Sequence, residues 1–282
     1  MEKAYKYRIY PNKKQKEIIA KTFGCCRFVY NTYLAKRIET YEKDKTTFTY
    51  VQCANDMKNL KTKLEWLKEV DSTALQSSLK DLDSAYRKFF KEHTGYPKFK
   101  SKKTHRYSYK SKCTNGNIRY CGKHIKLPKL GMVKTKNKLI PQGRILNATI
   151  SQAPSGKYYV SLCCTDVDIK PLKKTGNSVG IDLGIKEFCI TSDGKMVENH
   201  KYLNKSLNKL AKLQRELSRK SKGSSNRNKA RIKVARLQEH IANQRKDFLQ
   251  KLSTEIIRNN DVICLNLLDL LQMYHGLNLL EN

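Results

Sequence analysis

Residues 179–185 read Val-Gly-Ile-Asp-Leu-Gly-Ile, and this stretch decides how the C-terminal part of the chain folds. A short apolar run bounded by turn residues predicts a buried strand, here with Asp182 at its centre. A second apolar run, Val262–Leu268, has the same texture and carries Asn266. Together the two runs suggest the architecture of a metal-dependent nuclease, in which neighbouring strands hold carboxylates.

The chemistry of that site is incomplete in this sequence. A phosphodiesterase that uses two metal ions needs several carboxylates that converge on a pair of cations. Asp182 supplies one of them, whereas Asn266 offers a neutral amide that cannot replace an anionic ligand. The sequence ends at Asn282, before a third carboxylate strand could follow. We therefore predict a nuclease fold without nuclease chemistry: no enzyme, no functional magnesium or zinc site, and no required cofactor.

Composition indicates the class of partner. The chain carries 58 Lys and Arg against 25 Asp and Glu, a formal net charge of +33 over 282 residues. Such an excess favours polyanions as partners, although charge alone also fits a ribosome-associated or merely soluble basic protein. No apolar stretch is long enough for a membrane span, and the N-terminus does not resemble a signal peptide. We expect a cytoplasmic, nucleoid-associated protein with no membrane partner.

The nine cysteines support an intracellular setting. None forms a Cys-x-x-Cys motif, so the sequence contains no zinc ribbon, and an odd number without an export signal favours reduced thiols. Four of them lie in apolar, strand-like runs and are predicted to be small core residues: Cys163, Cys164, Cys189 and Cys264.

The spacing of apolar residues changes once within residues 1–92, from a strand pattern to a helical one. Residues 4–10 alternate with period two and end at Pro11-Asn12, which predicts a strand followed by a turn. From Lys13 the apolar residues recur at helical spacing, and further helices are expected at about 50–64 and 72–91. The apolar stripes are bundle core, so the exposed faces of these helices are the parts that could contact nucleic acid.

A basic, aromatic segment follows from Gly95. Cations interleaved with aromatic rings suit phosphate contact and base stacking, while a solvated basic loop is the alternative. The candidate contacts in this segment are Lys98, Lys100, Arg106 and Lys110. Short strands at 117–120, 124–127, 132–134, 144–151 and 157–165, separated by turns, then predict a small β-barrel that the strand at 4–10 joins.

The last part of the chain follows a linker at 170–178. It reads as a β-hairpin that presents Asp182, two long amphipathic helices at 202–219 and 229–260, and a strand at 261–265. Residues 201–251 hold 16 Lys and Arg against three acids, more than a solvated helix face needs, so we expect contact with a nucleic-acid backbone. The candidate contacts are Lys205, Lys212, Arg219, Arg231 and Arg245.

Several short motifs, in order along residues 5 to about 276, resemble TnpB, the compact RNA-guided nuclease of bacterial transposons. They are Arg8-Ile9-Tyr10-Pro11-Asn12, Cys26-Arg27-Phe28-Val29-Tyr30-Asn31, Ala74-Leu75-Gln76-Ser77-Ser78-Leu79, Gly95-Tyr96-Pro97-Lys98-Phe99-Lys100, Lys126-Leu127-Pro128-Lys129-Leu130-Gly131, Gly180-Ile181-Asp182-Leu183-Gly184, and residues 244–252. A co-linear set of this kind is far more specific than any one of its members.

The resemblance implies an α+β multidomain protein. Its parts would be an oligonucleotide-binding-type β-barrel, the wedge (1–11 and 93–172), a helical recognition insert (12–92), and a truncated RuvC-like domain of ribonuclease-H fold (173–282). It also implies a structured guide RNA, one protein per RNA, and a double-stranded DNA target beside a short motif that the protein reads. Tyr50, Gln76 and Thr114 align with family positions that touch this motif.

Two further positions near that motif depart from the family. Ser72 and Thr73 fall where the family often has a longer or basic side chain and an aromatic one, so the DNA motif that is read could differ. For Tyr50 the alternative is a ring that packs on the helical bundle. For Gln76, an amide on a leucine-lined helix, base contact is the favoured interpretation.

The resemblance places a Glu-Asp pair of the family at Asn266 and Leu267 of this chain. Asp182 would then be a vestigial acid, and the pattern resembles the nuclease-dead TnpB-like repressors, which occupy a promoter without cutting it. The predicted function is RNA-guided transcriptional repression. The alternatives are a decayed transposon fragment with residual RNA binding and an active nuclease that uses Asp269 or Glu281 as a replacement acid.

Overall fold

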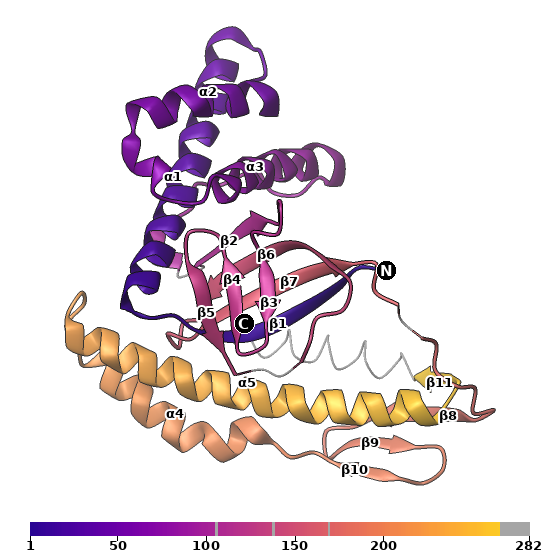
Figure 1. Cartoon of the computed structure of the whole chain (residues 1–282). Helices are drawn as coiled ribbons and strands as arrows, with labels where there is room; N and C mark the ends of the chain where they lie inside the picture. The colour runs from indigo at the N-terminus through magenta and orange to yellow at the C-terminus, as the bar shows by residue number, and fades with distance from the viewer. Residues whose placement is uncertain (105–106, 137–138, 169, 266–282) are drawn as a thin grey trace. The chain divides into compact units, whose positions relative to one another are not determined.

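The computed structural model describes residues 1–104, 107–136, 139–168 and 170–265 (Figure 1). It divides into two compact units, Met1–Ile169 and Lys170–Asn282. The three-part assignment of wedge, helical insert and RuvC-like domain stays a prediction, because helices and strands of the first unit share one hydrophobic core.

The first unit contains three α-helices, and each begins at a side-chain cap. α1 (Lys13–Asp44) and α2 (Tyr50–Lys63) start with capping boxes built on Asn12 and Thr49, whose side chains accept from the third helical amide. α3 (Ser72–Glu92) is capped by Asp71. Short 3₁₀ turns follow α2 and precede the sheet, η1 (Glu65–Lys68) and η2 (Lys102–Thr104). The predicted helices are thus confirmed, with bounds that differ by one or two residues.

Seven antiparallel strands form the sheet of the first unit. They are β1 (Lys3–Tyr10), β2 (Tyr107–Lys112), β3 (Arg119–Cys121), β4 (His124–Leu127), β5 (Gly131–Thr135), β6 (Arg144–Gln152) and β7 (Tyr158–Thr165). Their order is β2-β6-β7-β1-β5-β4-β3. β1 therefore lies inside the sheet, between β7 and β5, and its alternation buries Tyr5, Tyr7 and Ile9 on one face.

The predicted β-barrel is not closed among the described residues, since no pairing joins the edge strands β2 and β3. β2 is instead held against α3. The Ser111 hydroxyl donates to the Asp71 carboxylate at 2.6 Å, and the Lys112 amide donates to Thr73 Oγ1 at 3.1 Å. An edge strand that is covered by a helix in this way does not need a second strand to protect it.

The second unit combines a four-stranded sheet with a helical hairpin, which lies in the chain between the third and fourth of these strands. The strands are β8 (Ser178–Leu183), β9 (Glu187–Thr191), β10 (Met196–Glu198) and β11 (Val262–Leu265), in the order β10-β9-β8-β11. β11 runs parallel to β8, and the other pairs are antiparallel. α4 (Tyr202–Ser218) and α5 (Ser225–Asn259) pack against each other (Figure 1).

Three expectations differ from the structure. β2 was not predicted within the basic, aromatic segment after Gly95, but Tyr109 and Ser111 are buried and alternate with more exposed neighbours, which is a strand pattern. α5 begins at Ser225, four residues earlier than predicted, because the Ser224 side chain caps it by accepting from the Arg227 amide. Cys264 is exposed rather than buried, as is the whole of β11.

The other cysteine predictions are largely confirmed. All nine thiols are free, Cys164 and Cys189 are buried, and Cys163 is half-buried. Within the described residues, no helix combines the length and the apolar character that crossing a membrane requires.

Candidate nucleic-acid interface

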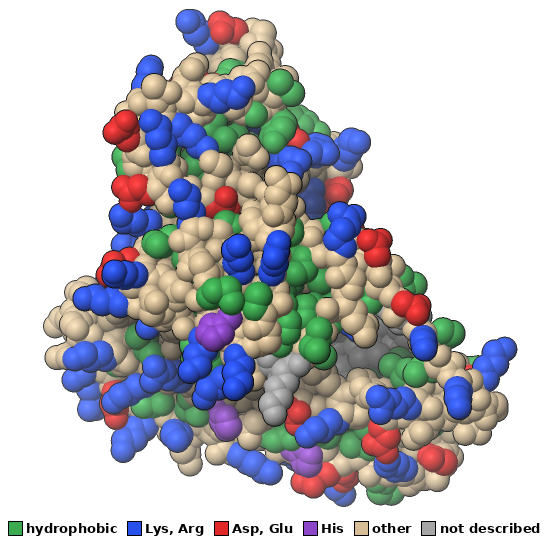
Figure 2. Space-filling model, in the orientation of Figure 1, with side chains coloured by type: hydrophobic (Ala, Val, Ile, Leu, Met, Phe, Trp, Pro, Cys, Tyr) green, Lys and Arg blue, Asp and Glu red, His purple; other side chains and the backbone are tan. Residues whose placement is uncertain are grey.

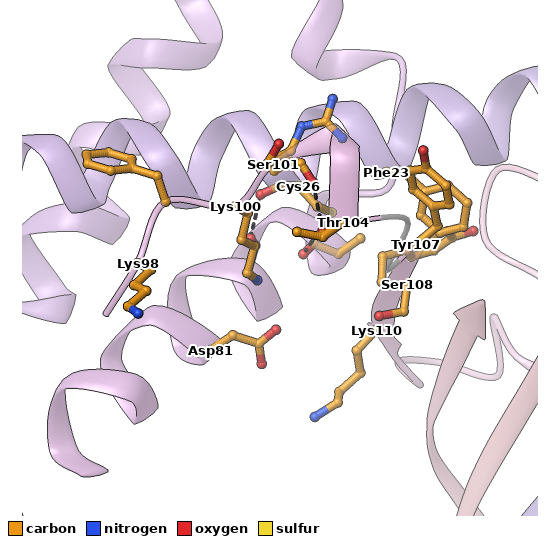
Figure 3. A pocket seen from close by; sticks show the side chains of 15 residues that line it. Phe23, Cys26, Asp81, Lys98, Lys100, Ser101, Thr104, Tyr107, Ser108 and Lys110 are labelled. Carbon is orange, nitrogen blue, oxygen red and sulfur yellow. Dashed lines mark hydrogen bonds between the residues drawn. The ribbon is translucent and has the colours of Figure 1, made fainter. Parts of the chain in front are cut away.

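The first unit contains a cavity of about 690 Å³ between α1, α3, β2 and the segment after α3. Three of the predicted contacts line it: Lys98, Lys100 and Lys110. Figure 3 shows their ammonium groups on the same side as the carboxylate of Asp81. The structure therefore places Lys98 and Lys100, from the segment after α3, at the same cavity as Lys110 of β2.

Lys100 is the most firmly held of these cations. The Asn31 side chain accepts from the Lys100 amide at 2.8 Å and donates to its carbonyl at 3.0 Å. Lys100 Nζ lies 3.9 Å from the centroid of the Tyr30 ring, a cation–π contact. Desolvation lowers the pKa of the Lys100 ammonium below its usual value. A cation with reduced hydration in a fixed position is suited to bind a phosphate.

Part of the remaining lining of this cavity is aromatic. The Phe23 ring lies 5.7 Å from both Tyr107 and Tyr109, and burial strongly raises the pKa of the Tyr109 phenol. Phe99 is largely exposed at the rim. Cations beside aromatic rings make the cavity suited to phosphates and bases.

A second group of residues lies on the exposed side of α3. Gln76 is exposed, and Lys80 follows one turn later on the same face. Lys80 Nζ lies 5.9 Å from the centroid of the Tyr50 ring, which also packs partly on the core. The pKa of Lys112 is lowered, mainly because the Lys80 amine beside it disfavours a second positive charge. Two contacting lysines of this kind favour an anion between them.

Sequence reasoning missed Lys80 and Lys112. The helical spacing from Gln76 could have indicated Lys80, because residues four apart share a helix face. Nothing in the sequence indicated Lys112, whose place depends on the packing of β2 against α3.

The other residues near the predicted DNA motif are not equally available. Thr73 Oγ1 donates to Asp71 at 2.6 Å and accepts from the Lys112 amide, so its hydroxyl has a structural role. Ser72 Oγ accepts from Lys61 Nζ at 2.9 Å. Thr114 is exposed in a turn that Asn117 closes. Contact of these residues with DNA stays a prediction, and Arg106 lies outside the described residues.

In the second unit, β8 buries Ile181 and exposes Asp182. Asp182 and Glu187 line one cavity of about 350 Å³, so they are the carboxylates that could meet a metal ion there. Within the described ranges, no group of three or more His, Cys, Asp or Glu is placed to hold a metal ion.

β11, which pairs with the strand that carries Asp182, is anchored at its start by Asp261. The Asp261 carboxylate accepts from the amides of Thr175 and Gly176 at 3.0 and 2.8 Å, and these hydrogen bonds lower the pKa of Asp261. β11 then pairs with β8 as far as Leu265, opposite Ile181. The residues on which the predicted loss of catalysis depends lie outside the described residues: Asn266, Leu267, Asp269 and Glu281.

The helical hairpin carries the remaining predicted contacts. Lys205, Lys212, Arg219 and Arg245 are exposed, whereas the Arg231 guanidinium is held by Asn228 Oδ1 at 3.0 Å. Arg227 has a different role, because its Nη1 donates to the carbonyls of Leu217 and Lys220, both at 2.9 Å. The contact of the five predicted residues of this hairpin with a nucleic-acid backbone stays a prediction. Figure 2 shows that Lys and Arg side chains outnumber Asp and Glu on the visible face.

Two family models match the chain. Residues 161–275 match the OrfB family of IS605, described as a probable transposase, and residues 1–46 match the helix-turn-helix domain of the same family. In this structure the second match covers β1 and α1.

Two curated relatives carry functional names. A "Putative RNA-guided DNA endonuclease" of Streptomyces pristinaespiralis is 36% identical over 268 residues, covering 93% of this chain and 66% of the relative. A "Putative RNA-guided DNA endonuclease InsQ" of Escherichia coli (strain K12) is 36% identical over 266 residues, covering 92% of this chain and 64% of the relative. The chain thus spans about two thirds of the length of these relatives.

A solved structure shares the fold. The chain resembles Cas12f1, solved in a complex with guide RNA and target DNA, with a TM-score of 0.54 and 10% sequence identity. The match covers 94% of this chain and 81% of that one. It supports the mixed α and β architecture and, with the OrfB match, is consistent with a RuvC-like second unit.

These matches correct one prediction and confirm another. The prediction that the chain is not an enzyme is wrong, because both relatives are named putative RNA-guided DNA endonucleases and the matching family is described as a probable transposase. The resemblance to TnpB is confirmed at the level of the family. The chain belongs to the IS605 OrfB transposase family, the family of TnpB.

Proposed function

We propose that this chain is an RNA-guided DNA-binding protein. It binds one structured guide RNA, and the guide pairs with one strand of a DNA duplex beside a short motif that the protein contacts. Sequence recognition is then delegated to base pairing, and the protein supplies contacts to backbone and shape. The names of the two relatives, each an RNA-guided DNA endonuclease, support this proposal.

The observation that carries the proposal is the cavity lined by Lys98, Lys100 and Lys110. Its described lining holds these lysines and Arg27 against a single acid, Asp81. An excess of cations in a concave site focuses a positive potential, and aromatic walls add stacking surface. A small neutral metabolite needs no such charge, whereas a phosphate backbone does.

The other surfaces have separate tasks in this proposal. The exposed face of α3, with Gln76 and Lys80, contacts the duplex beside the paired strand. The lysines and arginines of α4 and α5 contact the RNA or the RNA–DNA hybrid through phosphates. Binding uses no protein-held metal or other cofactor.

We further propose that a complex bound over a promoter represses transcription by occupying the site. A second candidate, DNA cleavage, is favoured by the names of the relatives and by Asp182, which is exposed in a cavity that Glu187 also lines. A carboxylate pair at that place could bind a divalent cation.

The binding experiment uses protein purified with its co-expressed RNA and the same protein after nuclease removal of the RNA. Fluorescence anisotropy measures the affinity of both for a guide-matched and a mismatched duplex at physiological salt. We expect RNA-loaded protein to prefer the matched duplex by at least about 10³-fold, in the range of specific over nonspecific binding. Equal affinity with and without RNA would contradict guided binding.

A reporter assay separates the two roles. A guide matched to the reporter promoter should lower expression while the plasmid remains intact, compared with a scrambled guide. Loss of the plasmid that Asp182→Ala prevents would instead assign cleavage and overturn repression by occupancy. The variant should leave the affinity measured by anisotropy unchanged, because Asp182 belongs to the second unit and does not line the cavity with the lysines.

A further inference from the structure

Four aromatic rings meet where α3 ends and the chain turns back. Phe89 lies 5.0 Å from Phe90 and 5.2 Å from Tyr96, measured between ring centroids. Tyr86 lies 5.7 Å from Tyr96 and 6.4 Å from Phe90, nearly parallel to the latter at 20°. We name these four residues the α3 platform.

The inner side of the α3 platform is fixed. The hydroxyls of Tyr86 and Tyr96 are 2.9 Å apart, and burial raises the pKa of the Tyr86 phenol. The Arg37 guanidinium lies 5.0 Å from the Tyr86 ring centroid and is paired with Asp83 at 3.3 Å. These contacts hold the rings in place before any ligand arrives, so little entropy would be lost on binding.

The outer side of the α3 platform is exposed. Phe90 is 69% exposed and Tyr96 is 45% exposed. Exposure of a phenylalanine ring to water is unfavourable, and a ligand that covered the ring would relieve this cost. Exposed apolar clusters often mark binding surfaces for this reason. Phe90 therefore presents a ring that the described residues leave mostly open to solvent.

The charges around the α3 platform indicate what covers it. Residues 86–98 include four exposed cations, Arg87, Lys88, Lys91 and Lys98, against one acid, Glu92. Asp83, just before this segment, pairs with Arg37 and Arg87, which leaves the three lysines in excess. A second copy of a chain with a net charge of +33 would be repelled from this surface. A polyanion with flat apolar groups would be attracted, and nucleic acid has both.

We propose that the α3 platform is a stacking site for unpaired nucleobases of single-stranded RNA. Bases inside a duplex have their faces covered by neighbours, so only an unpaired base can lie on the Phe90 ring. The neighbouring lysines and arginines would hold the phosphates on either side of that base. This inference rests on the proposed function, of which it specifies one contact.

A fluorescence experiment tests the stacking directly. The chain has one tryptophan, Trp66, so the double variant Trp66→Phe, Phe90→Trp carries its only indole in the α3 platform. The probes are an oligouridylate and an abasic ribose-phosphate oligomer of equal length and charge. We expect the oligouridylate to quench the indole and the abasic oligomer to leave it unquenched, although both supply phosphates.

Affinity measurements on single variants complete the test. Phe90→Ala and Phe90→Leu should each weaken oligouridylate binding by roughly 5- to 150-fold, the loss of one stacked base. Their affinity for the abasic oligomer and the salt dependence should be unchanged. Ile140→Ala is the matched control, because Ile140 is also 69% exposed and lies outside the α3 platform.

The outcomes separate this inference from the proposed function. If Phe90→Ala binds oligouridylate as tightly as the unmodified chain, the α3 platform does not stack bases, while guided binding can still stand. Self-association that Phe90→Ala abolishes would overturn the inference in favour of an interface between copies. If the unmodified chain binds neither oligomer nor its own RNA, the proposed function itself fails.

Discussion

At the scale of single residues, the proposed contacts on the exposed side of α3 are of two kinds, one suited to reading bases and one suited to holding phosphates. An amide such as Gln76 can pair with the edge of a base, whereas the ammonium of Lys80 acts as a point charge. The two side chains are one helical turn apart, so substitutions at either position change the same surface in different ways.

Gln76→Ala tests the first kind of contact. We expect it to weaken RNA-dependent binding by about 1–3 kcal/mol for a duplex with the correct adjacent motif, and little for a duplex with a scrambled motif. Lys80→Ala is the comparison, and it should weaken both duplexes alike and reduce the slope of affinity against salt. Anisotropy titrations measure both. A uniform loss for Gln76→Ala would show that the amide has a structural or backbone role.

The exposure of a candidate residue was predictable from the sequence only where a single element decides it. Gln76 stands out as an amide among leucines on a helix, and the structure leaves it exposed. Thr73 was predicted as a DNA contact, but its hydroxyl donates to Asp71 and accepts from the Lys112 amide. That role depends on a strand 39 residues away, which periodicity in a helix cannot indicate.

At the scale of elements, helix starts and periodic segments were predictable, because caps and apolar spacing are local. β2 was not, since its exposed face is as basic as a loop and its buried face has only Tyr109 and Ser111. The prediction of a closed barrel was also wrong, because α3 covers the edge of β2 and no strand pairs there among the described residues. Which edge of a sheet is covered is decided by tertiary packing.

The turn between α4 and α5 shows how one side chain can fix two helices. Arg227 donates to the carbonyls of Leu217 and Lys220, which belong to the last turn of α4 and the residues just after it. A cation at the C-terminus of a helix satisfies carbonyls that have no partner within the helix and interacts favourably with its dipole.

Arg227→Gln should therefore loosen the end of α4. We expect faster amide hydrogen exchange in residues 214–221, by a factor that corresponds to about 1–3 kcal/mol for the lost charge-assisted hydrogen bonds. Lys233→Gln is the control, since it removes the same charge from an exposed position of α5. Equal protection in the two variants would show that packing alone holds the hairpin.

At the scale of the whole molecule, the net charge of +33 works against compactness, and the hydrophobic core must offset it. That core uses tyrosines as large apolar groups: Tyr7 and Tyr33 are fully buried, and Tyr109 is nearly so. Burial is the main cause that raises the pKa of all three phenols. The folded state therefore depends on these groups remaining neutral.

The sign of the resulting pH dependence follows from linkage. In the unfolded chain phenols lose their protons near pH 10, whereas in the folded chain these three keep them to higher pH. The unfolded state then binds fewer protons above pH 10, so the free energy of unfolding is fully present below pH 10 and falls as the pH rises. Each group contributes about 1.4 kcal/mol per pH unit, so three groups lose about 4 kcal/mol by pH 11.

Urea unfolding at pH 8 and pH 11, followed by circular dichroism, measures this loss. Tyr7→Phe should make the loss smaller, because it removes one of the three phenols. It should also leave stability at pH 8 unchanged or slightly higher, since the buried Tyr7 hydroxyl has no hydrogen-bond partner among the described residues. Tyr41→Phe is the control, because the Tyr41 side chain is 58% exposed and lies outside the core. If both variants lost the same free energy of unfolding between pH 8 and pH 11, ionisation of the buried phenols would not be the cause of the loss at high pH.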